Sequence, residues 1–217
     1  MTSSGRYGTS NLTEDQYEPG SDGAVLKNLR GLTSREEMEI VETEELWRTQ
    51  EHLLGVIEQD QSFSAYDILD MHRIWLETVY AWAGKERQVN VSKNGFGFAM
   101  AHTITAMLEE FEQKQLARYT PCRFSDLEEI AQALAEVHVE LMLIHPFREG
   151  NGRLGRLVAT LMALQAGLPL LDFSDWVDEK REEYFSAVRA GLDRNYEPMA
   201  QLFRDVIRHS ERRDEED

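Results

Sequence analysis

Residues 125–161 constrain the fold more than any other part of the chain. Their first half repeats apolar side chains every three or four positions, which is the spacing of one buried helix face: Leu127, Ile130, Ala131, Leu134, Val137, His138 and Leu141. Ser125 and Glu128 have the spacing of a capping box and predict where this helix begins. Pro146 disfavours the α conformation at His145 and predicts where it ends. A second apolar stripe follows within a few residues, so we expect two buried helices joined by a short loop.

Most of the remaining chain has helical spacing as well. Ser34 has a glutamate three residues later and opens one segment, while Ser64 opens another that we expect to end at Gly84. Gly167 predicts the end of the helix that begins near Asn151. The expected helices cover residues 34–57, 64–84, 100–119, 125–145, 151–167, 175–190 and 195–213. We therefore expect an all-α fold, a helical bundle.

Residues 86–98 form the one segment that lacks helical spacing. Gln88 to Ser92 alternate polar and β-branched side chains, and Asn94-Gly95 is a dipeptide typical of tight turns. Phe96 to Phe98 follow as a second short strand. We expect a small β-hairpin, and because an isolated hairpin is only marginally stable, it should lie against the helices.

The charge balance limits the classes of partner. The chain has 23 Lys and Arg against 40 Asp and Glu, a net charge of −17, so it lacks the basic surface that duplex nucleic acid or an anionic membrane requires. Cys122 is the only cysteine, which excludes an intramolecular disulfide and suits a reducing compartment. No signal peptide and no apolar span of bilayer length is expected. We expect a cytoplasmic protein, and delivery into a host cell stays open.

The two ends of the chain differ from its middle in composition. Residues 1–23 are polar and rich in Gly and Ser, which is typical of a flexible arm, and residues 209–217 form a charged tail. No repeat and no linker interrupts the part between them. We therefore expect a single domain over residues 24–208.

Residues 145–156 read His-Pro-Phe-Arg-Glu-Gly-Asn-Gly-Arg-Leu-Gly-Arg. Gly150 and Gly152 allow the backbone to approach a ligand closely at the start of a helix, where unpaired N–H groups and the helix dipole favour anions. Arg153 and Arg156 lie three residues apart, so both should project from one face of the first turn, and guanidinium groups suit phosphate oxygens. This pattern predicts a phosphate site.

Two further side chains in this stretch indicate a reaction. Glu149 beside a polyphosphate would be a typical ligand for Mg²⁺, which keeps several waters and takes one or two protein oxygens. His145 faces the same loop, and a neutral imidazole can accept a proton from a hydroxyl nucleophile. Each residue alone is better explained by packing, capping or a solvated surface. Their joint occurrence favours transfer of a phosphorus-containing group from a Mg²⁺-nucleotide to a hydroxyl. Zinc-dependent hydrolysis is disfavoured, because no pair of histidines has zinc-site spacing.

These twelve residues resemble the complete motif of the Fic family, H-x-F-x-[D/E]-G-N-G-R-x-x-R, at every defined position. Upstream, Trp82-Ala-Gly-Lys85 and Arg87-x-Val89-Asn-Val-Ser-Lys93 resemble the family's flap hairpin and the segment that leads into it. The resemblance extends over residues 24–208. It implies an all-helical Fic domain with a small β-hairpin flap next to the active site.

The resemblance also implies an activity. Family members with the full motif transfer AMP from ATP to a Ser, Thr or Tyr hydroxyl of a target protein and release pyrophosphate. By resemblance, His145 would be the general base and Glu149 the Mg²⁺ ligand, while Arg153 and Arg156 would hold the β and γ phosphates.

Further roles follow from the same resemblance. Gly150, Asn151 and Gly152 would form an anion hole, and Asn151 and Arg156 would join His145 as catalytic residues. The flap would bind the target by adding a strand to its backbone, through Val89, Asn90, Val91, Ser92, Lys93, Phe96 and Phe98.

Chains of this size resemble the bacterial toxins of toxin–antitoxin pairs, some of which modify DNA gyrase or topoisomerase IV. The family's inhibitory motif, [S/T]-x-x-x-E-[G/N], is absent from the sequence, because Glu149-Gly150 is the only Glu followed by Gly or Asn. A separate antitoxin-like protein would then supply the inhibitory glutamate near Arg156, or the enzyme would be unrestrained.

Other reactions stay open. Transfer of UMP or phosphocholine fits the same motif, because contacts to the base lie outside it. Kinase activity is disfavoured, since Doc-like relatives carry a lysine where this chain has Gly152. A binding module without activity would have lost His145 or an arginine, and neither is lost.

Overall fold

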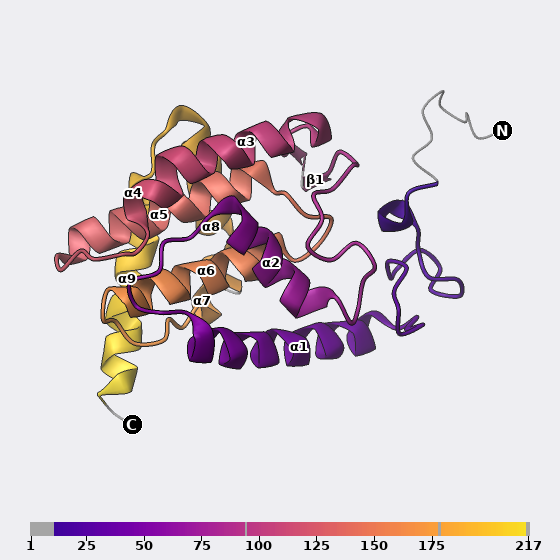
Figure 1. Cartoon of the computed structure of the whole chain (residues 1–217), viewed down its shortest axis with the longest axis horizontal. Coiled ribbons are helices and arrows are strands. Elements are labelled where there is room, and N and C mark those ends of the chain that lie inside the picture. Colours follow the sequence, from indigo (N-terminus) through magenta and orange to yellow (C-terminus); the bar gives the residue numbers. More distant parts are fainter. Residues whose placement is uncertain (1–10, 94, 178, 216–217) are drawn as a thin grey trace.

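The computed structural model describes residues 11–93, 95–177 and 179–215, and their helices form one bundle (Figure 1). The longer helices are α1 (Arg35–Val56), α2 (Ala65–Leu76), α3 (Ile104–Phe111), α5 (Leu127–Ile144), α6 (Asn151–Gln165), α8 (Arg181–Ala190) and α9 (Glu197–Asp214). Short turns are η1 (Thr13–Asp15), η2 (Ala101–Thr103), η3 (Glu112–Leu116), α4 (Ala117–Tyr119), α7 (Ser174–Val177) and η4 (Gly191–Asp193). The strands are β1 (Ser92–Lys93) and β2 (Phe96–Gly97). The expected helical bundle with one hairpin is confirmed.

α5 is the central helix of the bundle. It packs against α6, α9, α3 and α8, and its residues Ala131, Leu134 and Leu141 are at most 1% exposed. The apolar spacing in the sequence therefore marks the hydrophobic core. α6 follows after a short loop, and Gly167 ends it as predicted, in the left-handed conformation with φ 82°.

α1 and α2 lie side by side along one side of the bundle (Figure 1). Ser34 begins α1 by accepting a hydrogen bond from the backbone N–H of Glu37, and Ser64 begins α2 with a full capping box. α2 also packs on α3 and α6. Its residues His72 and Trp75 are fully buried, and both contact the loop between α5 and α6.

The predicted capping box at Ser125 is wrong. Asp126 is the N-cap residue of α5 and makes no side-chain cap hydrogen bond. Glu128 turns away from the helix start and pairs with Arg204 of α9 at 2.7 Å. A tertiary ion pair has thus taken the carboxylate that local spacing assigned to the cap.

Two other expected helices differ from the prediction. α2 ends at Leu76 and not at Gly84, because the chain folds back on α2: a Cβ at Gly84 would lie 2.5 Å from Cβ of Arg73. The segment 175–190 is broken into α7 and α8. The break allows Trp176 and Tyr184 to share one aromatic cluster, with ring centroids 5.1 Å apart.

The hairpin is smaller than expected. Its strands pair antiparallel over two residues each, with Ser92 opposite Gly97 and Lys93 opposite Phe96. Residues 88–91 are not a strand because side chains occupy backbone groups of this segment. The N–H of Gln88 donates to the carboxylate of Glu14, and the guanidinium of Arg87 donates to the carbonyl of Val89. Asn94 of the predicted turn lies outside the described residues.

The N-terminal segment contacts the bundle through Glu14. The carboxylate of Glu14 accepts a hydrogen bond from the backbone N–H of Gln88 at 2.6 Å, and Arg148 Nε donates to the carbonyl of Glu14 at 3.0 Å. The described part of the expected flexible arm is therefore attached, and residues 1–10 lie outside the described residues. At the other end, α9 continues to Asp214, so most of the expected charged tail is helical.

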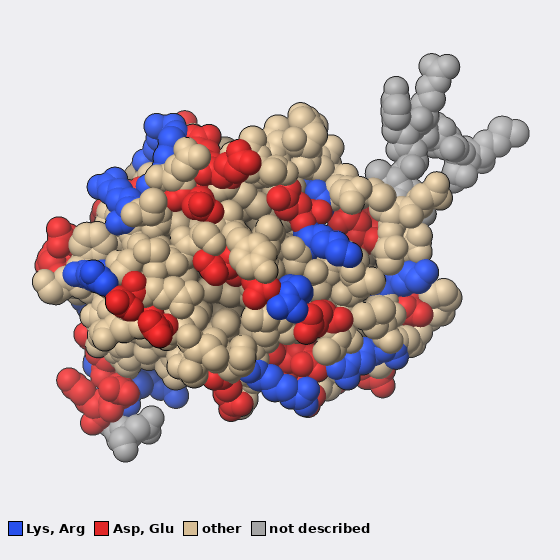
Figure 2. All heavy atoms as spheres, in the orientation of Figure 1, with Lys and Arg blue, Asp and Glu red and all other residues tan. Residues whose placement is uncertain are grey.

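Acidic and basic side chains are interspersed on the face that Figure 2 shows. Within the described residues, no helix combines the length and the apolar character that crossing a membrane requires.

Gly191 provides a test of the packing between α5 and the turn that follows α8. A Cβ at Gly191 would lie 2.1 Å from Cγ1 of Val139 on α5. Gly191→Ala should therefore lower the free energy of unfolding by about 1–3 kcal/mol, because the added methyl group would overpack the contact with α5. Gly55→Ala is the control: a Cβ there meets nothing within 4 Å, so stability should stay equal or rise by up to about 1 kcal/mol. Equal urea midpoints for both variants would contradict this packing.

Candidate active site

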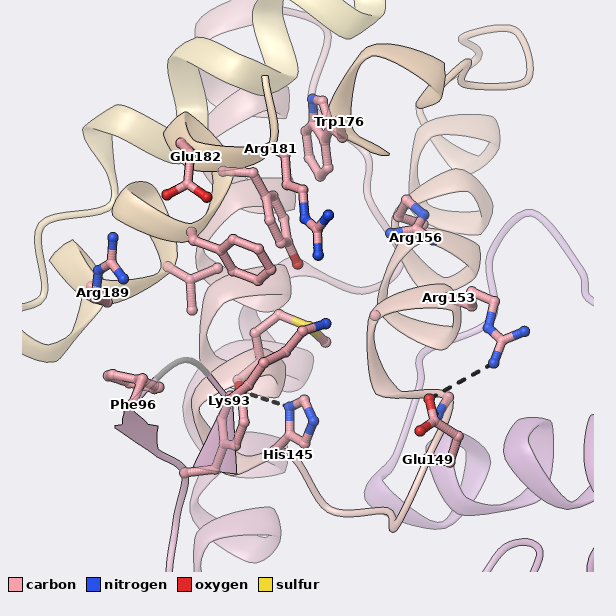
Figure 3. A pocket seen from close by; sticks show the side chains of 17 residues that line it. Lys93, Phe96, His145, Glu149, Arg153, Arg156, Trp176, Arg181, Glu182 and Arg189 are labelled. Carbon is pink, nitrogen blue, oxygen red and sulfur yellow. Dashed lines mark hydrogen bonds and ion pairs between the residues drawn. The ribbon is translucent and has the colours of Figure 1, made fainter. Parts of the chain in front are cut away.

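Several of the site residues expected from the sequence line one cavity of about 580 Å³ (Figure 3). The loop and the first turns of α6 contribute His145, Glu149, Gly150, Gly152, Arg153 and Arg156. The hairpin side contributes Lys93, Phe96 and Phe98. The opposite wall comes from α7 and α8 and includes Trp176, Arg181, Tyr184 and Arg189. Sequence reasoning missed this wall, because spacing within a helix does not show which helices meet.

His145 stands at the end of α5 in the left-handed conformation, with φ 50° and ψ 60°. Its Nδ1 lies 3.3 Å from the carbonyl oxygen of Met142. A carbonyl can only accept, so Nδ1 carries the proton and Nε2 keeps its lone pair. The ring of Phe98 stacks on the imidazole with centroids 3.7 Å apart. Burial lowers the pKa of His145 to about 3, so the imidazole is neutral near pH 7 and can accept a proton.

The conformation of the loop before α6 is fixed by close packing at Gly150 and by hydrogen bonds of Asn151. Gly150 has φ 87°, and a Cβ there would lie 2.7 Å from the ring of Trp75, so only glycine fits. The amide of Asn151 is buried and binds the backbone of Phe147 twice: Oδ1 accepts from the N–H at 3.0 Å and Nδ2 donates to the carbonyl at 2.8 Å. The side-chain amide of Asn151 therefore holds the loop together and is not part of the cavity lining.

Arg153 and Arg156 both line the cavity but differ in their partners. Nη2 of Arg153 lies 2.6 Å from Oε2 of Glu42 on α1 and 3.8 Å from Oε1 of Glu149. Arg156 has no ion pair with any described residue. Burial lowers the pKa of Arg156, which reflects the cost of a cation without a counter-ion. An anion in the cavity would supply that counter-ion.

Glu149 lies at the mouth of the cavity with its side chain 50% exposed. Its Oε1 accepts a hydrogen bond from the N–H of Gly150 at 3.0 Å. This contact holds the carboxylate at the start of α6, and Figure 3 shows it joined to Arg153 by a dashed line.

The expected flap residues do not all face the cavity. Val89 is buried, Asn90 caps η2, and the carbonyl of Val91 accepts from Phe98 N–H at 3.3 Å. Ser92 is exposed on β1. Lys93, Phe96 and Phe98 are the flap residues that line the cavity.

Arg87 is a supporting residue whose role spacing did not reveal. Its side chain is 1% exposed and donates hydrogen bonds to four backbone carbonyls. Two belong to the end of α5, those of His145 at 2.7 Å and Ile144 at 3.3 Å. The other two belong to the hairpin segment, those of Val89 at 2.7 Å and Ala99 at 2.6 Å. Arg87 therefore fastens the hairpin to the backbone of the candidate base.

His72 of α2 supports the loop between α5 and α6 by a hydrogen bond to its backbone. The backbone N–H of Gly84 donates to its Nδ1 at 2.9 Å, so the proton sits on Nε2, which donates to the carbonyl of Glu149 at 3.1 Å. The ring stacks on Phe147 with centroids 3.7 Å apart. Burial lowers the pKa of His72 to about 4, so this arrangement holds near neutral pH. On an apolar stripe, such a histidine carries no sequence signal of its own.

Residues 62–163 match the model of the Fic/DOC family. The protein adenylyltransferase VbhT of Bartonella schoenbuchensis is 31% identical over 192 residues, which are 88% of this chain and 39% of VbhT. The probable protein adenylyltransferase y4lH of Sinorhizobium fredii is 27% identical over 201 residues, which are 91% of this chain and 98% of y4lH. The chain thus spans less than half of VbhT and nearly all of y4lH.

Two solved structures, one of them described as a Fic domain, have a similar fold. BepC from Bartonella tribocorum, with bound AMPPNP, has a TM-score of 0.70 at 21% identity. The match covers 90% of this chain and 97% of the BepC chain. A VirB-translocated effector from Bartonella quintana, with bound ADP, has a TM-score of 0.70 at 25% identity and covers 90% and 95%. The bundle with its hairpin is therefore a Fic fold.

Arg87→Lys should lower the free energy of unfolding by about 2–4 kcal/mol, because one ammonium group cannot reach four carbonyls and leaves some of them buried and unpaired. Arg73→Lys serves as the matched control: Arg73 is 46% exposed in its ion pairs with Asp70 and Glu77, so the change should leave the urea midpoint nearly unchanged. Urea unfolding measures both. A loss at Arg87 no larger than at Arg73 would contradict the role of the four hydrogen bonds.

His145→Ala should flatten the pH dependence of stability. Burial lowers the pKa of His145 to about 3, while an unfolded histidine has a pKa of about 6.5. The stability that the buried imidazole contributes is therefore fully present above about pH 6.5 and is lost as pH falls toward the folded pKa. From about pH 7 to about pH 5, wild type should lose about 1–2 kcal/mol more than the variant in urea unfolding. Parallel curves would show that the imidazole is not buried in its neutral form.

Proposed function

We propose that this chain is a protein adenylyltransferase, an enzyme that moves AMP from ATP to a hydroxyl of a target protein. The match of residues 62–163 to the Fic/DOC family supports this activity. The observation that carries the proposal is the shared cavity of His145, Glu149, Arg153 and Arg156. The names of the relatives VbhT and y4lH state this activity, and similar solved Fic domains hold AMPPNP or ADP.

The proposed reaction is a displacement at the α-phosphorus of ATP. The oxygen of a target Ser, Thr or Tyr hydroxyl forms a bond to this phosphorus. The bond between the phosphorus and the oxygen that bridges to the β-phosphorus breaks, and pyrophosphate leaves with that oxygen and its electron pair. His145 takes the hydroxyl proton at Nε2, the nitrogen whose lone pair is free because Nδ1 binds Met142.

The start of α6 provides the proposed phosphate contacts. The backbone N–H groups of Asn151 and Gly152 would bind phosphate oxygens, favoured by the helix dipole. The N–H of Gly150 would join them on leaving the carboxylate of Glu149, to which it donates at 3.0 Å. Arg153 and Arg156 would bind the β and γ phosphates, and Arg156 would gain the counter-ion that it otherwise lacks. Positive charge at these positions stabilises the charge that builds up on the departing pyrophosphate.

A Mg²⁺ ion fits this donor set through Glu149. Among the described residues, no group of three or more His, Cys, Asp or Glu side chains could hold a metal. One carboxylate beside a polyphosphate is enough for Mg²⁺, which takes its remaining ligands from phosphates and water. When bound, the ion would neutralise phosphate charge and favour departure of pyrophosphate.

The hairpin is the proposed docking site for the target. A segment of the target would add to an edge of the two short strands, which uses backbone hydrogen bonds and places few demands on its side chains. Lys93 and Phe96 line the cavity at this edge, so an added strand would present its hydroxyl near His145. This mode is compatible with many targets, including the DNA gyrase or topoisomerase IV subunits that similar toxins modify.

We further propose that a separate antitoxin restrains the enzyme in the cytoplasm. The sequence contains no [S/T]-x-x-x-E-[G/N] motif. Arg156 lines the cavity and has no carboxylate partner among the described residues, so it is open to a glutamate from another chain. The domain would extend over residues 24–208, since α1 and α9 pack on α2 and α5 of the matched part.

Labelled ATP tests the reaction. With Mg²⁺ and bacterial lysate, label at the α-phosphate should appear on a target band, and His145→Ala should lower this labelling by about 10²-fold or more, because it removes the base. Nucleotide binding by the variant should stay within about twofold of wild type, since no phosphate contact is lost. His102→Ala, a change at an exposed histidine of η2, is the matched control and should retain activity.

Three outcomes would contradict the assigned reaction. Label that appears only from the γ-phosphate of ATP would mean phosphorylation. Transfer from UTP in place of ATP would mean that the donor is another nucleotide. Equal α-labelling by wild type and His145→Ala would remove His145 from the mechanism.

A further inference from the structure

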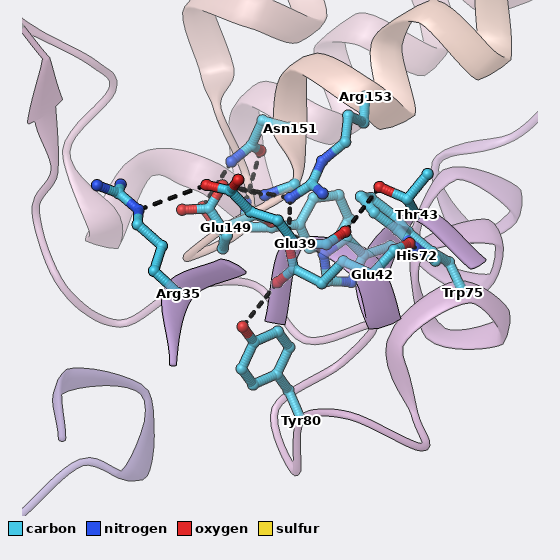
Figure 4. Close-up of polar contacts among 12 residues, drawn as sticks. Arg35, Glu39, Glu42, Thr43, His72, Trp75, Tyr80, Glu149, Asn151 and Arg153 are labelled. Atoms are coloured by element: carbon cyan, nitrogen blue, oxygen red, sulfur yellow. Dashed lines mark hydrogen bonds and ion pairs between the residues drawn. The ribbon is translucent and has the colours of Figure 1, made fainter. Parts of the chain in front are cut away.

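A buried carboxylate lies directly behind one of the two cavity arginines (Figure 4). Glu42 comes from α1, outside the matched family segment, and its side chain is 5% exposed. Its Oε2 accepts a hydrogen bond from Nη2 of Arg153 at 2.6 Å. A glutamate this deeply buried needs partners for both oxygens, because an unpaired buried charge is strongly unfavourable.

The second oxygen of Glu42 is also occupied. The hydroxyl of Tyr80 donates to Oε1 at 2.7 Å. The backbone carbonyl of Glu42 accepts from Nε1 of Trp75 at 2.8 Å, so the residue is fixed by its main chain as well. Burial, with Glu42 as the next cause, raises the pKa of Tyr80, and the phenol therefore remains a donor at every pH at which the protein would work.

The same surroundings fix the orientation of the Arg153 guanidinium. Trp75 lies against one face, with Cζ of Arg153 4.9 Å from the ring centroid. Both carboxylate contacts, to Glu42 and to Glu149, are made through Nη2. Nη1 and Nε remain as donors, and the side chain lines the cavity. An arginine held on one face and at one nitrogen loses little freedom when it binds a phosphate.

We propose that Glu42 is a positioning residue for nucleotide binding: with Tyr80 and Trp75 it holds Arg153 in the orientation that binds a phosphate beyond the α position. This inference rests on the proposed function, because it takes Arg153 to be a phosphate ligand. Glu42 does not touch the nucleotide itself. Its contribution is to keep the guanidinium aligned before the nucleotide arrives.

The burial of Glu42 shows that its ion pair with Arg153 is a permanent support and not a contact that must break before a nucleotide binds. Release of Arg153 would leave the carboxylate of Glu42 buried with Tyr80 as its one remaining donor, which is strongly unfavourable. The ion pair therefore persists when a nucleotide binds. Arg156 has no such partner among the described residues, so the two arginines reach the same cavity in different ways.

A comparison of two nucleotides separates positioning from general support of the fold. AMPPNP carries the β and γ phosphates, and AMP lacks them. If Glu42 aligns Arg153, Glu42→Gln should weaken AMPPNP binding by about tenfold, the scale of one charge-assisted contact, and leave AMP binding within about twofold. A residue that merely joined α1 to α2 would affect both nucleotides equally.

Glu45→Gln is the matched control. Glu45 lies on the same helix and pairs with Arg30 at 2.7 Å and Arg48 at 3.1 Å, so the variant loses a similar charge without touching Arg153. Both dissociation constants are measured by calorimetry on the full chain with Mg²⁺, AMP being measured by displacement. Glu45→Gln should leave both unchanged.

Glu42→Asp covers the case in which Glu42→Gln does not fold. It keeps the buried charge but withdraws the carboxylate by one methylene, so the AMPPNP-selective loss should recur. Equal weakening of AMPPNP and AMP, no weakening of either, or tighter AMPPNP binding in the folded variant would each overturn the inference.

The failure of the proposed function gives a different result. Wild type would then bind AMPPNP no better than AMP, and Arg153→Ala would not change that ratio. If wild type and Arg153→Ala behave as phosphate binding requires but the Glu42 variants do not, the positioning role alone is wrong.

Discussion

The guanidinium of Arg87 is the contact on which the geometry of the site depends. It is buried, has no ion pair with a described residue, and donates to carbonyls at the end of α5 and on both sides of the hairpin. The planar group thus ties the left-handed backbone of His145 to the segment proposed to hold the target. The candidate base and the flap therefore form one unit, and Phe98 completes it by stacking on the imidazole.

Features that depend on neighbours in sequence could be predicted. The apolar stripe of α5, its end before Pro146 and the glycine-flanked start of α6 all follow from local spacing and backbone sterics. For the same reason, the residues from His145 to Arg156 could be assigned to one site from the sequence alone. They occupy twelve consecutive positions, and a single loop brings them together.

Features that depend on distant contacts could not be predicted. Arg87 reaches His145 across 58 positions, His72 reaches Glu149 across 77, and Arg153 reaches Glu42 across 111. Within their own helix or loop, the spacing of Arg87, His72 and Glu42 does not reveal these contacts. The capping box at Ser125 failed for a related reason, since Glu128 found a better partner on α9. Local spacing shows which partners a side chain could have within its own helix, and the packing of the helices decides which partner it binds.

The two walls of the cavity come from separate stretches of the chain. The wall of motif residues belongs to the matched segment 62–163, whereas Trp176, Arg181, Tyr184 and Arg189 follow it in sequence. Natural variation can therefore reshape the second wall without touching the motif. A lineage could change what it accepts in the cavity while inheriting its chemistry intact, and sequence comparison centred on the motif would not register the change.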